Sequence, residues 1–423
     1  MKKNFKFILG LSAISTVIPG ITVACNNSKS TQKSNVNTAD ELKQKIESLS
    51  KNDQIKLISS LNLSVDEKAD LIAKLNSGAG IVASLVWYMN SAEQRLASLQ
   101  AYALATQAYD NLKTQNIDGF DYTKVNSDTG LVTNPDAGKA IPVVFMDIDE
   151  TVFVNEYTET AVVLENDGRF IEDKKDAVDA KGNRRAVAGA INFINHVFEN
   201  GGIVLFNSGI RQLEASVAGI KKNLIKAGVK PEYVHDWMFW CSGVEPISSV
   251  EGDTITYDKT PWRTAIEKFK NGTANSKATS KNQRMNAVSD NTTGWNFSEA
   301  QTGAGDAVVT KVVMKIGDDF NDFFDDAYKP EKKNSVNVEW SKKPEVEKLF
   351  TDFKGTAKGV KVTREGKNEA ILTGLDWNQV YVQVPGNAMY GGWTREYGYG
   401  AFTKLWAALK DIIANSQDNV ESA

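Results

Sequence analysis

Two aspartates that directly follow an apolar run form the pattern in this chain best suited to chemistry. Asp147 and Asp149 come after the run 143–146, and Thr151 follows them. Short apolar runs rich in branched residues are typical of buried strands, and the period of two along a strand directs both carboxylates to the same side. Neighbouring carboxylates repel, so the pair favours a bound cation or a shared proton. For Asp-x-Asp alone, a solvated turn is the alternative interpretation.

Later segments repeat this arrangement of an apolar run followed by polar residues. Ser208 comes after the run 203–206, and Asp318 and Asp322 come after the run 312–316. In open α/β sheets, ligands bind at the carboxyl ends of the strands. The sequence therefore predicts that these polar side chains meet at one edge of a sheet.

Taken in order, the segments resemble a known superfamily. Asp-x-Asp-x-Thr, then Ser208, then Lys259 and then Gly-Asp-Asp-x-x-Asp resemble the motifs of the haloacid dehalogenase superfamily of phosphatases. Two of these residues have other readings. Ser208 could be a helix N-cap, and Lys259 could be a solvated surface charge, with Arg263 in its place.

The resemblance implies a role for each aspartate. Asp147 is expected to be the nucleophile that forms an aspartyl-phosphate, and Asp149 the general acid and then the base. Mg²⁺ is expected as the cofactor, because it prefers oxygen ligands and is held by one or two carboxylates. Its ligands would be the carboxylates of Asp147 and Asp318 and the backbone carbonyl of Asp149, with Asp322 in the outer shell. The residues expected to bind the phosphate group are Thr151, Ser208 and Lys259.

A closer resemblance covers residues 82–412. The segments 86–93, 185–190 and 385–393 resemble those of the class C nonspecific acid phosphatases, the lipoprotein e-type 5′-nucleotidases. This resemblance implies that the substrates are small phosphate esters, above all nucleoside 5′-monophosphates. Tyr390 and Trp393 are candidates to stack on the base, although both residue types are also common in protein cores.

The alternation of strands and helices predicts an α/β fold, a doubly wound parallel sheet of the haloacid dehalogenase type. The segment between Thr151 and Ala186 and the helices over 82–115 are expected to form a smaller helical cap-like domain. A polar insert over 271–307 is expected to be a mobile surface excursion. The strands are expected near 142–147, 203–207, 237–241, 312–316 and 380–384, and the main helices near 188–199, 212–227, 261–270, 322–327 and 401–414.

The amino terminus predicts export and lipid attachment. Three lysines precede an apolar stretch that ends at Cys25, which resembles a bacterial lipoprotein signal cleaved before that cysteine. An uncleaved membrane anchor is the alternative. We therefore expect a lipid-anchored protein on the extracytoplasmic face of the cell membrane. The expected divisions are a signal peptide (1–24), a flexible tether (25–38), a helical spacer (39–78), a phosphatase domain (79–415) and a tail (416–423).

Composition excludes several other site types. The chain has 423 residues, two histidines and two cysteines, so a multi-histidine or cysteine-cluster metal site is improbable. A net charge of −4 gives no indication of binding to a nucleic-acid duplex. Two alternatives to nucleotide hydrolysis stay open. One is a surface-binding or adhesin lipoprotein that keeps the fold with weak or no catalysis, and the other is a phosphatase for sugar phosphates or nucleic-acid ends.

Overall fold

The computed structural model of the chain describes residues 79–164, 170–241, 260–265 and 279–388, with scattered residues near the two ends. Contacts divide the chain into two units, one formed by residues 81–396 and the other by residues 1–80 and 397–423. All the elements discussed below, apart from the first two residues of one helix, belong to the first unit. The expected signal peptide and tether lie outside the described residues.

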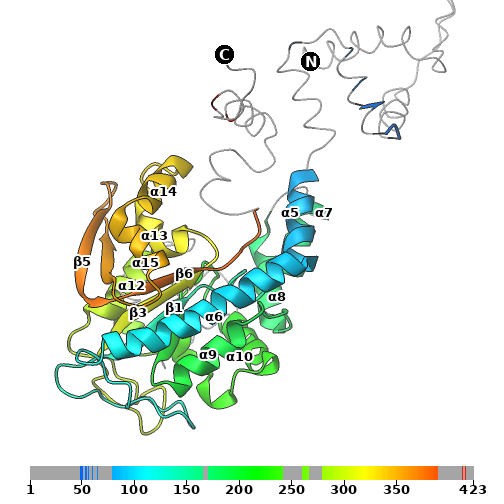
Figure 1. The fold of residues 1–423 in the computed structure, drawn as a ribbon. Helices are drawn as coiled ribbons and strands as arrows, with labels where there is room; N and C mark the ends of the chain where they lie inside the picture. The colour runs from blue at the N-terminus through cyan, green and yellow to red at the C-terminus, as the bar shows by residue number, and fades with distance from the viewer. Residues whose placement is uncertain are drawn as a thin grey trace, which may run out of the picture. The chain divides into compact units, whose positions relative to one another are not determined.

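A parallel sheet of four strands forms the centre of this unit (Figure 1). The strand order is β2-β1-β3-β6, so β1 lies between β2 and β3, and all neighbours pair in parallel. Every residue of β1 and β2 is buried, which requires helices on both faces of the sheet. The predicted doubly wound α/β sheet is therefore confirmed. Its strands are β1 (Ile141–Met146), β2 (Ile203–Phe206), β3 (Thr310–Gly317) and β6 (Val380–Gln383).

Helices cover the sheet in two groups. One group contains α6, which contacts α9 and β6 and crosses in front of the sheet in Figure 1. The other contains α12 and α13, which contact β3, and α15, which contacts β6. A two-stranded antiparallel hairpin, β4–β5, packs beside α12 and α13. The helices are α5 (Ala79–Asn90), α6 (Ala92–Gln115), α7 (Glu156–Leu164), α8 (Glu172–Lys181), α9 (Ala190–Glu199), α10 (Glu214–Ala227), α12 (Lys281–Asp290), α13 (Asn321–Tyr328), α14 (Asn334–Ser341) and α15 (Pro344–Thr351), and the hairpin strands are β4 (Lys358–Thr363) and β5 (Ile371–Asn378).

Helix α6 belongs to the main core rather than to a cap. Ser91 caps its first turn by accepting a hydrogen bond from the Gln94 backbone N–H at 3.1 Å. Its buried residues recur at helical spacing, and Tyr102, Tyr109 and Leu112 pack into the same core as the sheet. The expectation that 82–115 contributes to a cap is wrong for α6. Beside the sheet, α7 and α8 are the helical elements of the expected cap segment.

The expected mobile excursion over 271–307 is wrong for its described part, 279–307. Helix α12 begins with a capping box, in which Ser280 and Gln283 each bind the other's backbone N–H. Further on, Trp295 and Phe297 are buried against Trp262. The polar composition of α12 was misleading because its buried polar side chains bind the backbone of neighbouring elements, as Asn282 does by donating to the Phe323 carbonyl of α13 at 2.8 Å.

The expected strand over 237–241 is reduced to a single bridge. A short 3₁₀ helix occupies Asp236–Met238, and only Phe239 pairs with Phe206 at the edge of β2. Cys241 follows, fully buried, with its backbone N–H donating to Gln212 Oε1 at 2.9 Å. Burial raises the pKa of the Cys241 thiol to about 12.

Strand β3 carries two lysines with different surroundings. Lys315 is 4% exposed, and its ammonium lies 4.5 Å from the ring centroid of Tyr381. Burial lowers its pKa to about 7. Lys311, four residues earlier, lies 4.8 Å over the ring of Trp377 but is only half-buried. Among the described residues, no carboxylate forms an ion pair with Lys315.

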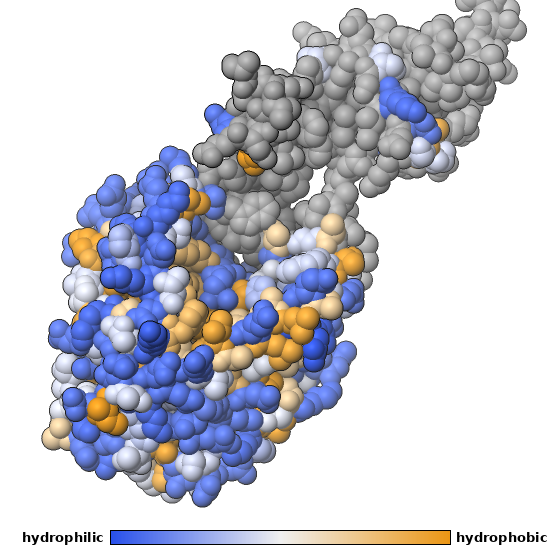
Figure 2. Space-filling view, viewed as in Figure 1, coloured by the Kyte–Doolittle hydropathy of each residue, from blue (hydrophilic) through white to orange (hydrophobic). Residues whose placement is uncertain are grey.

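Apolar residues also reach the surface. Figure 2 shows hydrophobic residues gathered across the face along which α5 and α6 run, where Trp87, Leu96 and Leu104 are among the exposed side chains. Within the part of the chain that the structure describes, none of the helices combines the length and the apolar character needed to cross a bilayer.

Candidate active site

Three carboxylates meet at the carboxyl ends of β1 and β3. The ladder continues past β1, because the Asp147 N–H donates to the Ile316 carbonyl at 3.0 Å. Asp147, Asp318 and Asp322 each place a carboxylate oxygen within 4.8 Å of the others. Gly317 is required at the end of β3, because a Cβ there would overlap the carboxylate of Asp322. The structure thus brings together three of the four aspartates that the sequence predicted as metal ligands.

Lys281 is the cation of this cluster. Its ammonium donates to Asp147 Oδ1 at 2.5 Å and to Asp322 Oδ1 at 2.7 Å, and its side chain is 15% exposed. Sequence reasoning chose Lys259 and missed Lys281. The signal was the Ser-x-x-Gln capping box that begins at Ser280, which places a lysine in the first turn of a helix.

Burial and mutual repulsion shift the pKa of each carboxylate in the cluster. Burial raises the pKa of Asp147 to about 7; Lys281 opposes this shift, while Asp322 and Asp149 add to it. Burial followed by repulsion from Asp322 and Asp147 raises the pKa of Asp318 well above its ordinary range. Conversely, burial alone would lower the pKa of Lys281, but Asp147 and Asp322 outweigh it and raise that pKa. One lysine therefore leaves this group of three carboxylates with excess negative charge.

The donor set fits a divalent metal ion. Oxygen ligands from buried carboxylates suit hard cations, and a charge of +2 would balance the three carboxylates and the single lysine. Both oxygens of Asp322 are already engaged, Oδ1 by Lys281 and Oδ2 by the Asp319 N–H at 3.0 Å. Asp147 and Asp318 therefore have the freer oxygens. Because both oxygens of Asp322 are engaged, this residue suits the outer shell of a metal ion, the position expected from the sequence.

The turn after Asp149 is held from two helices. Glu150 has φ of 60°, a left-handed conformation that non-glycine residues rarely adopt, and its carboxylate is buried. Tyr88 of α5 donates to the Glu150 carbonyl at 3.0 Å, and Tyr102 of α6 donates to the Thr151 carbonyl at 2.6 Å. Thr151 itself donates to Asp318 Oδ1 at 3.2 Å, so the turn and the end of β3 are connected.

Asp149 is paired with two cations. Arg184 Nη1 lies 2.5 Å from Asp149 Oδ1, and Lys175 Nζ of α8 lies 3.2 Å from the same oxygen. Burial by itself would raise the pKa of Asp149, but Lys175 and Arg184 outweigh it and lower the pKa to about 2. Lys175 and Arg184 therefore shift the pKa of Asp149 in the direction opposite to that of Asp147.

Ser208 lies at the end of β2, next to the end of β1. It is buried, and its hydroxyl accepts a hydrogen bond from the Ile210 N–H at 3.4 Å. Helix α10 begins later, at Glu214, so Ser208 is not its N-cap. The loop that carries Ser208 is held by the buried Arg284. This arginine donates to Asn207 Oδ1 at 2.6 Å and to the Ser208 carbonyl at 3.2 Å. Sequence reasoning did not identify Arg284.

Four predicted residues lie outside the described part of the chain. These are the phosphate-binding candidate Lys259, the stacking candidates Tyr390 and Trp393, and the lipidation candidate Cys25. Arg263, the possible substitute for Lys259, is described and exposed at the rim of a hollow that Asp147 does not line.

About two thirds of the sequence matches a family model. Residues 66–351 match the model of the HAD superfamily, subfamily IIIB (Acid phosphatase). The chain belongs to this family of acid phosphatases. It is therefore a phosphomonoesterase, and the family membership predicted from the sequence motifs is confirmed.

Two solved structures are similar to this acid phosphatase. The class C acid phosphatase from Bacillus anthracis has 15% sequence identity and a TM-score of 0.43, covering 77% of this chain and 94% of its own. The class C acid phosphatase from the same organism with tungstate bound has 16% identity and a TM-score of 0.42, covering 81% and 97%. No curated protein sequence matches the chain. The family model carries the assignment.

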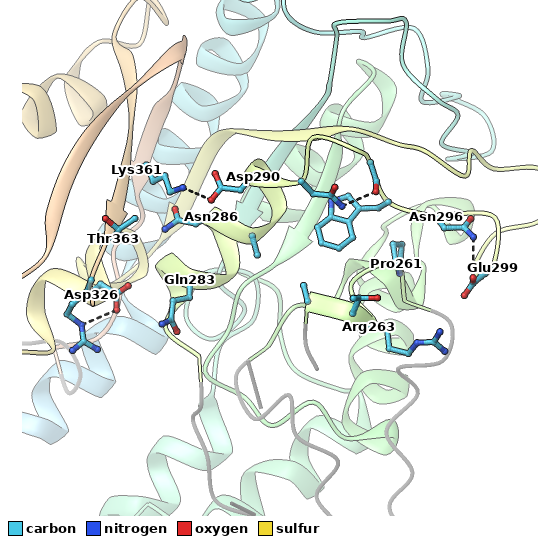
Figure 3. Close-up of a pocket in the computed structure, with 17 residues that line it drawn as sticks. Pro261, Arg263, Gln283, Asn286, Asp290, Asn296, Glu299, Asp326, Lys361 and Thr363 are labelled. Atoms are coloured by element: carbon cyan, nitrogen blue, oxygen red, sulfur yellow. Dashed lines mark hydrogen bonds and ion pairs between the residues drawn. The ribbon is translucent and has the colours of Figure 1, made fainter. Parts of the chain in front are cut away.

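Hollows at the surface of the described residues show where a small molecule could sit. One of about 620 Å³ runs along the outer face of α12, where Gln283, Asn286 and Asp290 line it and Lys361 of β4 pairs with Asp290 (Figure 3). None of the three clustered carboxylates, Asp147, Asp318 and Asp322, lines it. The other, of about 450 Å³, lies between α7 and α8 and has Tyr157 and Arg184 in its wall. Arg184 also binds Asp149, so this second hollow shares a residue with the surroundings of Asp149.

Proposed function

We propose that this acid phosphatase is a Mg²⁺-dependent enzyme that hydrolyses nucleoside 5′-monophosphates and related esters through an aspartyl-phosphate. The proposal also places the enzyme on the extracytoplasmic face of the membrane, anchored by a lipid on Cys25. The observation that carries the catalytic part is the meeting of Asp147, Asp318 and Asp322 with Lys281 at the ends of adjacent parallel strands.

Asp147 is the nucleophile in this proposal. Lys281 binds its Oδ1 and so holds the carboxylate in one orientation. A carboxylate must approach a negatively charged phosphoryl group, so the positive charge of Lys281 beside it reduces the repulsion. Attack forms the aspartyl-phosphate bond and releases the alcohol, and water then cleaves that bond to give inorganic phosphate.

Asp149 transfers the proton in both steps. In the first step its protonated carboxyl gives a proton to the departing ester oxygen, and in the second the resulting carboxylate takes a proton from the attacking water, which restores the carboxyl. Its carboxylate is partly exposed, with a side-chain exposure of 26%, whereas that of Asp147 is 7%. Asp149 can therefore reach a leaving group at the surface of the site.

The metal ion would be held by Asp147 and Asp318, with Asp322 behind them. When bound, Mg²⁺ would offset the charge of the phosphoryl oxygens. Thr151 and Lys281 keep the two metal-binding carboxylates in place, the first through Asp318 and the second through Asp147. Ser208, at the end of the neighbouring strand, is the proposed hydrogen-bond donor to the phosphate.

A nucleoside leaving group is supported by the second hollow and by the sequence resemblance. The hollow of about 450 Å³ beside Arg184 is within the usual range for small-molecule sites. Tyr157 in its wall is 55% exposed and presents an aromatic side chain. An aromatic ring stacks on any base, so this position suits a nucleoside without selecting one.

The decisive experiment measures phosphate release from adenosine 5′-monophosphate by the purified full-length protein. Release with Mg²⁺, its loss with chelator and its loss in Asp147→Asn would support the proposal. Folded protein that releases phosphate equally well after the Asp147→Asn change would refute the mechanism. A hexose phosphate and an oligonucleotide with a terminal phosphate, tested in parallel, separate the nucleotide proposal from the two other ester classes.

Lipid anchoring needs its own test. Cells that express the protein would be fractionated, and Cys25→Ser should move the protein from the membrane to the soluble fraction. Retention of Cys25→Ser in membranes would favour an uncleaved anchor instead. An adhesin with weak catalysis is less well supported than an enzyme, because the aspartates and Lys281 form an intact constellation.

A further inference from the structure

Asp149 is the exposed end of a buried group of four charges. Asp179 lies behind it, with its carboxylate 2.6 Å from Lys175 Nζ and 3.2 Å from Arg184 Nη2. The side chains of Lys175 and Arg184 are each 4% exposed and that of Asp179 is 0% exposed, against 26% for Asp149. We call Asp149, Lys175, Asp179 and Arg184 the acid-base quartet. Only one of its members faces solvent.

The quartet is electrically balanced. Two carboxylates face two cations, so the group can be buried without a net charge. Asp179 contacts both Lys175 and Arg184, so these two cations are held by a second carboxylate as well as by Asp149. Asp149 is thereby kept apart from Asp147, which has Lys281 as its own cation.

The backbone that carries the two cations is fixed. Asn223 of α10 exchanges two hydrogen bonds with the Arg184 backbone, at 2.6 and 2.8 Å. Gly182 and Gly219 let the end of α8 approach α10 so closely that a Cβ on either glycine would overlap the backbone of the facing segment. Arg184 Nη1 also donates to Asn155 Oδ1 at 2.6 Å, which fixes the direction of the guanidinium. The cations therefore hold Asp149 from rigid elements.

We propose that Arg184 and Lys175 are positioning residues that aim the Asp149 carboxylate at the leaving oxygen of the ester. The inference deepens the proposed function and rests on it, because it assumes that Asp149 transfers the proton. Arg184 Nη1 donates to both Asp149 Oδ1 and Asn155 Oδ1, and this shared donor fixes the Asp149 carboxylate in one rotamer. Proton transfer needs hydrogen-bond geometry, so a loosened Asp149 slows the departure of a leaving group that needs a proton.

The test compares two esters, of which only one needs a proton on its leaving oxygen. A p-nitrophenyl phosphate releases a stable phenolate without a proton, whereas an alkyl phosphate needs a proton on its leaving oxygen. The value of kcat/KM covers only the steps up to departure of the alcohol, so later attack by water does not affect it. Both esters are measured with the full-length protein and Mg²⁺, for wild type, Arg184→Gln, Arg184→Lys and the control Arg185→Gln.

Arg184→Gln should lower kcat/KM for the alkyl ester about 100-fold and for the aryl ester less than tenfold. Arg184→Lys, which keeps the quartet neutral, should recover part of the loss. Arg185 is a matched control, since it is the neighbouring arginine and pairs at the surface with Glu156 at 2.7 Å. Arg185→Gln should leave the ratio between the two esters unchanged.

An equal loss for both esters in folded Arg184→Gln would overturn the proposal and leave the quartet a purely structural link. If a thermal melt shows that Arg184→Gln does not fold, Arg184→Lys decides: a ratio shifted tenfold supports the proposal and an unchanged ratio overturns it. Failure of the proposed function has a different signature. In that case wild type hydrolyses neither ester, or Asp147→Asn remains as active as wild type.

Discussion

Replacing Lys315 with methionine should stabilise this phosphatase at low pH and remove part of its pH dependence. A lysine pKa that falls from 10.5 to about 7 on folding corresponds to about 5 kcal/mol, at about 1.4 kcal/mol per unit. Below pH 7 both the folded and unfolded states are protonated, so the folded state carries this cost in full. Methionine has a similar volume and no charge, but it loses the contact with the Tyr381 ring, about 1–2 kcal/mol. The net gain should be about 3 kcal/mol.

The sign of the pH dependence follows from proton binding. Between pH 7 and 10.5 the unfolded state holds the Lys315 proton and the folded state does not, so wild-type stability rises with pH. The advantage of Lys315→Met should therefore fall by about 1.4 kcal/mol per pH unit in this window and approach zero near pH 9. A small cavity of about 10 Å³ beside Lys315 holds at most one water, so hydration cannot remove the effect.

Urea unfolding at pH 6, 7, 8 and 9, followed by tryptophan fluorescence, measures these differences. Lys311→Met is the matched control, because Lys311 lies on the same strand and also faces an aromatic ring but is only half-buried. Lys311→Met should not be more stable than wild type at pH 6. If Lys315→Met is less stable than wild type at pH 6, or if its difference is the same at every pH, the reasoning is refuted.

Three other changes give sharp expectations. Gly317→Ala should lower kcat at least tenfold and weaken Mg²⁺ binding, measured by metal titration of activity, because a Cβ would displace Asp322. Arg284→Met should destabilise the protein by about 3 kcal/mol in urea unfolding, since it leaves the buried Asn207 and Ser208 acceptors without a donor. Chelation should abolish phosphate release and lower Tm, and added Mg²⁺ should restore both; a Tm unaffected by chelator would argue against a metal held by Asp147 and Asp318.

The sequence was sufficient for the parts of the site that follow strand geometry. Asp147, Ser208 and Asp318 each come directly after an apolar run, and parallel strands bring such positions to one edge. The strand positions near 141–146, 203–206 and 310–317 were also predictable, because buried strands leave a continuous apolar signal.

The site residues that the sequence did not predict are placed by contacts between polar residues far apart in the chain. Lys281 lies in a stretch of polar composition, and only the fold shows that its helix packs against β3. Arg184 and Lys175 reach Asp149 from a segment whose charges are arranged like those of a solvated surface helix. Their burial depends on pairing with Asp179, and no local pattern encodes a pair of this kind. The burial of these three cations therefore follows from tertiary ion pairs and not from any periodic pattern in the sequence.

The buried thiol of Cys241 makes the protein convenient for site-specific labelling. The chain has two cysteines, and once Cys25 is lipidated or replaced by serine, only Cys241 remains. Its full burial and raised pKa keep it protonated and out of reach of maleimide reagents. A single cysteine introduced on the exposed face of α8 would therefore carry a fluorophore or spin label alone, and would report in real time how the helix that holds Asp149 moves when an ester binds.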